Sequence, residues 1–155
     1  MPNDNQFKLK TLYIGTRGVK EYRDSIPEFL NERDTVLEIG CEWGTTTTTI
    51  SQHCKEVIGT DVSPDCIKVA KEKYPQLNFD VLDVFNINQA MQLYKKFKFN
   101  KMYIDVSGLS GYSSLLDVIA LLNMYSSVFN LELVVVKSGS LKNFAKRCVA
   151  YQAKL

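Results

Sequence analysis

Short apolar runs alternate with segments of helical periodicity along most of the chain. The apolar runs predict strands near residues 35–39, 56–60, 77–81, 102–105 and 131–136. The segments between them predict helices near 45–53, 64–73, 87–97 and 113–128, and a last helix is marked by Leu141 to Cys148. Regular alternation of strands and helices is typical of a parallel sheet with right-handed crossovers. The pattern therefore predicts an α/β, Rossmann-like three-layer sandwich whose mostly parallel sheet has five strands.

The first 30 residues follow a different pattern. Residues 7–14 fit a short extended piece, and apolar residues from Val19 to Leu30 then recur at helical spacing. Because Pro27 falls inside that spacing, two separate turns are expected in place of one helix. We interpret residues 1–30 as a lead-in or a cap over the site, and residues 31–155 as the main domain.

The segment from Val36 to Thr46 carries the most information about function. Its apolar strand ends near Glu38, a glycine turn follows, and a threonine-rich helix begins. At the carboxyl edge of a parallel sheet, glycines let the backbone approach a ligand, and the next helix presents unpaired N–H groups. We therefore predict cofactor contacts from Glu38, Gly40, Cys41 and Gly44, with Glu38 facing a positively charged or hydroxyl-bearing group. The alternative is a strand-to-helix turn with a purely structural role.

A second acid, Asp61, ends the next predicted strand. It follows the first acid by about 20 residues, the place where such folds hold ribose hydroxyls. Asp61 and its neighbour Val62 are therefore predicted to contact a nucleoside. The alternative for Asp61 is an acid that interacts with the dipole of the helix capped by Ser63.

These acids also select among nucleotide-like cofactors. The dinucleotide pattern Gly-x-Gly-x-x-Gly is absent, and Glu38 and Glu42 would repel a pyrophosphate. S-adenosylmethionine carries a sulfonium, an amino group and a ribose but no phosphate, so acidic side chains favour it as the cofactor.

At these motifs the chain resembles the class I S-adenosylmethionine-dependent methyltransferases, and the resemblance covers nearly the whole chain. The family's first motif is an acid-x-Gly-x-Gly-x-Gly loop, and the sequence departs from it at Glu42, which stands in place of the middle glycine. Fibrillarin and the FtsJ-type RNA ribose methyltransferases likewise keep only the outer glycines, here Gly40 and Gly44. The run Gly44-Thr45-Thr46 is also similar to the Gly-Thr-Thr of fibrillarin.

The resemblance implies further cofactor contacts after the third strand. Relatives place an acid there near the adenine amino group, which corresponds to Asp83. The apolar side chains of Val62, Val84 and Phe85 would then surround the adenine ring. The alternative for Asp83 is an N-cap of the following helix.

Asp105 and Lys137 are the predicted catalytic residues. Each ends a central strand at the edge where the transferred methyl group would lie, and Asp105 is also predicted to contact the cofactor. The resemblance implies that they belong to the Lys-Asp-Lys-(Glu/His) group with which fibrillarin and FtsJ-type enzymes handle a ribose 2′-hydroxyl, with Lys20 as a candidate for the first lysine. The alternatives are a strand-end lysine that extends into water and an acid that binds the cofactor or caps a loop.

The family's sheet normally gains a two-stranded hairpin beside strand five, and the sequence lacks it. The closing Glu or His of the catalytic group would come from those strands, so we interpret the domain as C-terminally incomplete or as part of a longer gene product. An exposed apolar edge promotes aggregation. We therefore expect strand five to be covered by the N-terminal extended piece, by a second copy of the chain or by a partner.

Composition limits the remaining possibilities. With 155 residues, 45% of them hydrophobic, the chain suits a single domain. No apolar run reaches the roughly 18 residues of a membrane span, and the first residues lack the layout of a secretory signal, so we expect a cytoplasmic protein without membrane contact. Four scattered cysteines and a single histidine predict no metal site.

Charge is concentrated at the two ends of the chain. Residues 1–23 carry five Lys/Arg and two acids, and residues 133–155 carry five Lys/Arg and no acid. If the two ends share a face, that face would attract RNA; the alternative is ordinary solvated charge. The sequence thus predicts an S-adenosylmethionine-dependent methyltransferase, with an RNA ribose 2′-hydroxyl as the favoured acceptor. The alternatives are a small-molecule or protein methyltransferase on the same fold, or a non-catalytic S-adenosylmethionine-binding partner subunit.

Overall fold

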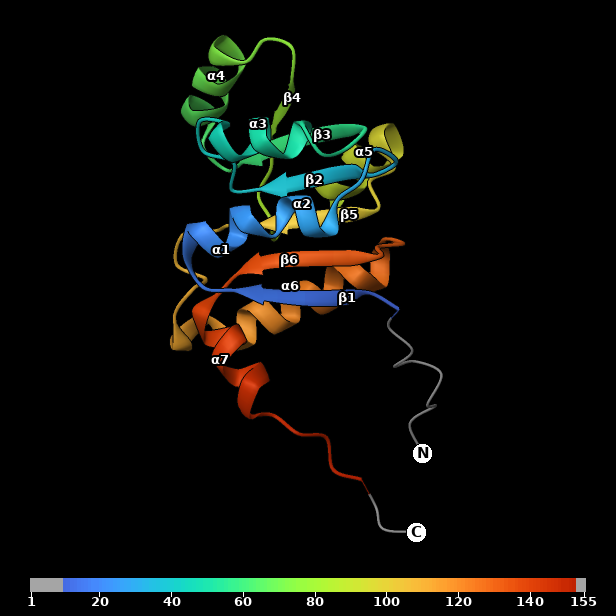
Figure 1. Ribbon diagram of the computed structural model, residues 1–155. Helices are drawn as coiled ribbons and strands as arrows, with labels where there is room; N and C mark the ends of the chain where they lie inside the picture. Colours follow the sequence, from blue (N-terminus) through green and yellow to red (C-terminus); the bar gives the residue numbers. More distant parts are fainter. Residues whose placement is uncertain (1–9, 153–155) are drawn as a thin grey trace.

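A six-stranded parallel sheet forms the centre of the molecule (Figure 1). The computed structural model describes residues 10–152. The strands are β1 (Leu12–Thr16), β2 (Thr35–Ile39), β3 (Glu56–Asp61), β4 (Asn78–Val81), β5 (Lys101–Ile104) and β6 (Leu133–Lys137). Their order across the sheet is β1-β6-β5-β2-β3-β4, and every neighbouring pair is parallel. The Rossmann-like prediction is confirmed, although the sheet has six strands where five were predicted.

Helices cover both faces of the sheet (Figure 1). They are α1 (Gly18–Asp24), α2 (Ile26–Phe29), α3 (Thr45–Ser51), α4 (Pro64–Lys73), α5 (Ile87–Phe97), α6 (Leu115–Val128) and α7 (Gly139–Arg147), with a 3₁₀ turn at Tyr112–Ser114. One apolar cluster joins α5 and α6 to the side of β2 that carries Leu37 and Ile39. A second joins α1, α2 and α3 to the opposite side, where Val36 points. The alternation of buried side chains along β2 thus separates two cores.

The N-terminal segment becomes an edge strand of the same sheet. β1 pairs with β6 in parallel, from Leu12 opposite Leu133 to Thr16 opposite Lys137. The prediction that the N-terminal extended piece covers this edge is confirmed for residues 12–14, while residues 7–9 lie outside the described part of the chain. A second copy or a partner is not needed to cover β6. The helical segment that follows is divided at Ser25, one residue before Ile26 and Pro27, as expected.

The most apolar helix, α6, is buried on one side only. Val118, Leu121, Leu122 and Tyr125 lie in the core, whereas the side chain of Leu116 is 79% exposed. The expectation of deep burial all round is therefore wrong, because α6 is an outer layer of the sandwich with solvent on its far side. Within the described residues, no helix is both long and apolar enough to cross a membrane.

Candidate active site

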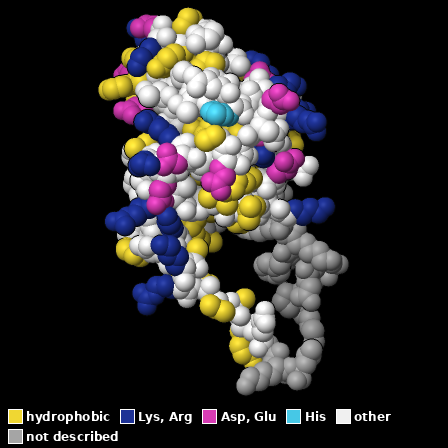
Figure 2. All heavy atoms as spheres, viewed as in Figure 1, with side chains coloured by type: hydrophobic (Ala, Val, Ile, Leu, Met, Phe, Trp, Pro, Cys, Tyr) yellow, Lys and Arg dark blue, Asp and Glu magenta, His cyan; other side chains and the backbone are white. Residues whose placement is uncertain are grey.

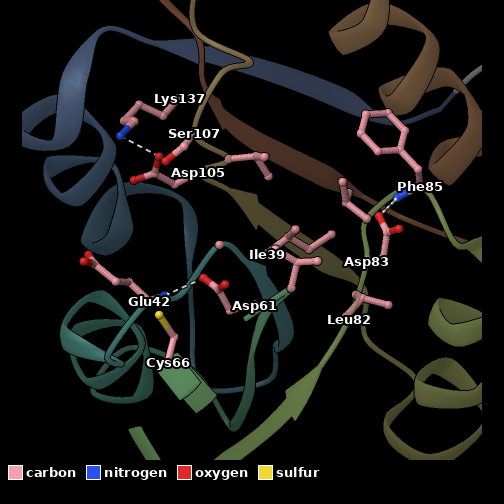
Figure 3. Close-up of a pocket in the computed structure, with 14 residues that line it drawn as sticks. Ile39, Glu42, Asp61, Cys66, Leu82, Asp83, Phe85, Asp105, Ser107 and Lys137 are labelled. Carbon is pink, nitrogen blue, oxygen red and sulfur yellow. Dashed lines mark hydrogen bonds and ion pairs between the residues drawn. The ribbon is translucent and has the colours of Figure 1, made fainter. Parts of the chain in front are cut away.

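A cleft of about 480 Å³ lies where the loops after β2, β3, β4 and β5 meet at the carboxyl edge of the sheet (Figure 3). Parallel α/β folds bind ligands at this edge, and the volume lies in the range of small-molecule pockets. Seven of the predicted site residues line the cleft: Gly40, Asp61, Val62, Asp83, Val84, Asp105 and Lys137. Glu38, Cys41 and Gly44 are not among its lining residues.

The turn after β2 needs its two glycines for contacts inside the protein. Gly40 has a φ of +85°, and a Cβ atom there would lie 1.8 Å from the carbonyl oxygen of Asp105. Gly44 has a φ of +83°, and a Cβ atom would lie 2.7 Å from the ring of Phe79. Only glycine satisfies both conditions without strain. The turn therefore packs closely against the β5 loop and β4, which holds it over the edge of the sheet.

Glu42 occupies the left-handed region with a φ of +50°, at the position where relatives carry a glycine. This backbone conformation is unfavourable for a residue with a Cβ atom. It brings the Glu42 N–H to 3.0 Å from Oδ2 of Asp61, to which it donates a hydrogen bond (Figure 3). The loop therefore keeps the glycine-like path despite the substitution, and the Glu42 side chain adds an acid to the cleft lining.

Asp61 connects two loops beside the cleft. Its Oδ2 accepts the bond from Glu42, and its Oδ1 accepts a bond from the N–H of Ser63 at 3.0 Å. Ser63 in turn caps α4 by accepting a bond from the N–H of Cys66. Each carboxylate oxygen has a further lone pair, so Asp61 can still accept a bond from a ligand hydroxyl in the cleft.

Glu38 lies beneath the cleft. Its side chain is buried on the α3 side of β2, where its Oε2 accepts a hydrogen bond from the hydroxyl of Thr47. Burial raises the pKa of Glu38 to about 7; the bond from Thr47 opposes this rise, and the charge of Asp105 adds to it. The hydroxyl-bearing group predicted to meet Glu38 is, in this structure, a threonine of the protein itself.

Apolar side chains and one acid form the wall opposite Asp61. Val62 and Phe85 are 66% and 57% exposed, which is high for side chains of this type, and both line the cleft. Asp83 accepts a bond from the N–H of Phe85 at 3.0 Å (Figure 3). The N-cap of α5 is Asn86, so Asp83 does not have that alternative role. A flat aromatic ring fits between such apolar surfaces.

Asp105 and Lys137 form an ion pair at the far side of the cleft (Figure 3). The Nζ atom of Lys137 lies 2.5 Å from Oδ1 of Asp105, and the two side chains are 25% and 20% exposed. β5 and β6 are neighbours in register, so their ends bring the two residues together. Lys20, by contrast, pairs with Asp24 on the exposed face of α1 and does not line the cleft.

Other lining residues were not singled out from the sequence. They are Ile39, Cys66, Leu82, Val106 and Ser107. Cys66 is in the first turn of α4, one turn after its cap, and Ser107 follows Asp105 by two residues, so proximity to predicted residues was the available signal. In the described part of the chain, no three His, Cys, Asp or Glu side chains are grouped so as to hold a metal ion.

Comparison with known proteins agrees with this geometry. Residues 37–137 match the family described as a methyltransferase domain. The 23S rRNA (uracil(1939)-C(5))-methyltransferase RlmD of Francisella tularensis subsp. novicida is 32% identical over 81 residues, which are 49% of this chain and 18% of the relative. A probable cobalt-precorrin-6B C(15)-methyltransferase (decarboxylating) of Methanococcus vannielii is 30% identical over 109 residues, 70% of this chain and 57% of the relative.

Solved structures agree on the fold. A TehB-like SAM-dependent methyltransferase from Corynebacterium glutamicum has a TM-score of 0.53 at 16% identity, over 81% of this chain and 70% of that chain. The PH0226 protein from Pyrococcus horikoshii has a TM-score of 0.52 at 19% identity, over 84% and 64%. The chain therefore belongs to the methyltransferase-domain family, with the class I fold and with S-adenosylmethionine as its cofactor. The finer resemblance to fibrillarin stays a prediction.

Proposed function

We propose that this chain transfers a methyl group from S-adenosylmethionine in the cleft to a hydroxyl held beside Asp105 and Lys137, and that the acceptor is an RNA ribose 2′-hydroxyl. The observation that carries this proposal is the Asp105–Lys137 ion pair at the carboxyl edge of the sheet, on the lining of the cleft. The chain spans 18% of the length of the ribosomal RNA methyltransferase that it resembles.

The side chains of the cleft suit a cationic nucleoside. Glu42, Asp61, Asp83 and Asp105 supply negative charge, which would repel a diphosphate and attract a sulfonium or an ammonium. Asp61 would accept bonds from the ribose hydroxyls. Val62, Val84 and Phe85 would enclose the adenine ring, with Asp83 beside its amino group.

The chemistry requires alignment and a proton acceptor. When bound, S-adenosylmethionine supplies an electrophilic methyl group whose bond to sulfur breaks as the acceptor oxygen forms its own bond to carbon. Lys137 donates a hydrogen bond that orients the acceptor oxygen. Asp105 holds Lys137 in place through Oδ1, and its Oδ2 takes the hydroxyl proton. The apolar side chains exclude water from the reacting atoms.

An RNA acceptor is supported by the charge of α7. Lys142, Lys146 and Arg147 lie on this helix, and Figure 2 shows Lys and Arg side chains gathered over it. Lys142 is paired with Glu21 at 2.7 Å, whereas no salt bridge involves Lys146 or Arg147 among the described residues. The helix follows Lys137 directly in the chain, so a bound polyanion would pass close to the cleft.

Radioactive methyl transfer tests the proposal. The protein is incubated with methyl-labelled S-adenosylmethionine and a mixture of structured RNAs, and the product is digested to nucleosides. Label in 2′-O-methylnucleosides is the expected result, and label in a base or in no RNA would contradict the RNA ribose proposal. A double substitution, Lys146→Ala with Arg147→Ala, should weaken RNA binding and lower its salt dependence by one to two phosphate contacts, about 0.7 to 0.9 in slope for each. The matched control is Lys68→Ala with Lys71→Ala on α4.

A small-molecule acceptor is the second candidate. It is favoured by the similarity over 70% of the chain to the probable cobalt-precorrin methyltransferase. Transfer of label to small metabolites but not to RNA would support this candidate.

A further inference from the structure

Tyr22 on α1 has a buried hydroxyl that forms no hydrogen bond with any group in the described part of the chain. The residue is completely buried. Among the described residues it is the sole side chain with a buried polar atom in this condition. A buried hydroxyl without a partner is costly, so each such group in a folded protein calls for an explanation.

The position of Tyr22 relates this hydroxyl to the cleft. Its ring packs edge-on against Tyr103, with ring centroids 5.3 Å apart. Tyr103 lies opposite Glu38 in the register of β5 and β2, and Asp105 comes two residues later on the same face of β5. Burial raises the pKa of Tyr22 well above its usual value, and the charges of Glu38 and then Asp105 add to the rise. The hydroxyl is therefore near two carboxylates, one of which lines the cleft.

The surroundings decide which ligand group would complete this hydrogen bonding. A tyrosine hydroxyl can donate and accept, and the two neighbouring acids favour a cation with N–H donors. A carboxylate would be repelled there, and a sulfonium has no hydrogen to donate. An ammonium group satisfies both the acids and the hydroxyl.

We infer that the Tyr22 hydroxyl, together with Glu38 and Asp105, binds the ammonium group of the cofactor's amino-acid end. This inference rests on the proposed use of S-adenosylmethionine. It assigns a ligand contact to α1, a helix that comes before the whole glycine-turn motif. α1 thereby becomes part of the cofactor site, and the buried hydroxyl gains its partner when the amino-acid end is bound.

Calorimetric titration with two probes tests the inference. S-adenosylhomocysteine keeps the ammonium group, and methylthioadenosine has the adenine and ribose but no amino-acid end. Tyr22→Phe keeps the ring and removes the hydroxyl. It should weaken S-adenosylhomocysteine binding about tenfold or more, as expected for a bond to a charged group, and leave methylthioadenosine binding unchanged within twofold. Thermal unfolding should show the variant to be at least as stable as the wild type.

Tyr103→Phe is the matched control. It removes a hydroxyl that is already 3.1 Å from Oγ of Ser25, so it should lower stability without changing the affinity for either probe. An unchanged affinity of Tyr22→Phe for S-adenosylhomocysteine, or an equal loss for both probes, would overturn the assignment of the ammonium contact. If the wild-type protein bound neither probe, the proposed function would fail together with this inference.

Discussion

Lys137 and Asp105 come from neighbouring strands, and their charged groups are 2.5 Å apart at the mouth of the cleft. Pairing at this distance fixes the direction of the lysine side chain, which is otherwise flexible. The pair is partly exposed, so an acceptor molecule can reach it.

Removal of the lysine should reduce catalysis more than binding. Lys137→Ala is expected to lower kcat by about two orders of magnitude, the usual size of a lost proton-handling or orienting group, and to change the Kd for S-adenosylmethionine by less than about threefold. Single-turnover methyl transfer and calorimetry measure the two effects. Lys20→Ala, which removes an exposed ion pair on α1, should leave both unchanged. Full activity in Lys137→Ala would instead favour an acceptor that needs no orienting lysine.

Asp61→Ala should impair both cofactor binding and local structure. The substitution removes the acceptor of the two N–H bonds from Glu42 and Ser63, and we expect a loss of about 1–2 kcal/mol in the free energy of unfolding. The Kd for S-adenosylmethionine should rise about tenfold or more. Asp80→Ala, on the neighbouring strand and outside the cleft lining, provides the comparison. An unchanged Kd for Asp61→Ala would refute the ribose assignment.

The left-handed conformation at residue 42 makes a clear prediction for stability. Glu42→Gly should be more stable than Glu42→Ala by about 1 kcal/mol, because both variants lack the carboxylate but only alanine keeps the strain at a φ of +50°. Urea denaturation of the two variants measures the difference. Equal stability would mean that the loop relaxes to another path in the alanine variant.

The buried Glu38 should make stability depend on pH. Its pKa is about 7 in the folded protein and near 4.5 when unfolded, so the folded state holds a proton that the unfolded state has lost between these values. The free energy of unfolding should therefore fall as the pH rises from about 4.5 to about 7, by an amount on the order of 3 kcal/mol.

Glu38→Gln isolates this contribution, since an amide does not titrate. The difference in unfolding free energy between wild type and variant, measured at pH 5 and at pH 8, should change in favour of the variant at the higher pH. A constant difference across this range would show that Glu38 titrates at its ordinary value in the fold.

Much of this architecture could be predicted because periodicity and strand ends carry it. The apolar runs placed β2, β3, β4, β5 and β6 within about two residues. Parallel strands bring their carboxyl ends to one edge, so Asp61, Asp83, Asp105 and Lys137 were expected to converge, and they do.

Side-chain orientation was harder to obtain from the sequence. Glu38 ends an apolar run, as Asp105 does, yet it precedes Ile39 and lies inside the strand, where alternation turns it toward α3 and Thr47. For Tyr22, helical spacing indicated an apolar face, but the position of its hydroxyl depends on the packing of α1 against the sheet. Likewise, β1 has only five residues, too few for a pattern to define its partner or direction.

The pairing of β1 with β6 joins segments separated by about 120 positions in the chain, as the bond from Thr16 to the carbonyl of Val136 illustrates. Contacts of such separation form late, because they must overcome a large loss of chain entropy. During synthesis on the ribosome, the opening strand would wait unpaired until nearly all the remaining residues had emerged. Completion of the sheet, and with it the seating of α1 near the cleft, would then be among the last events of folding.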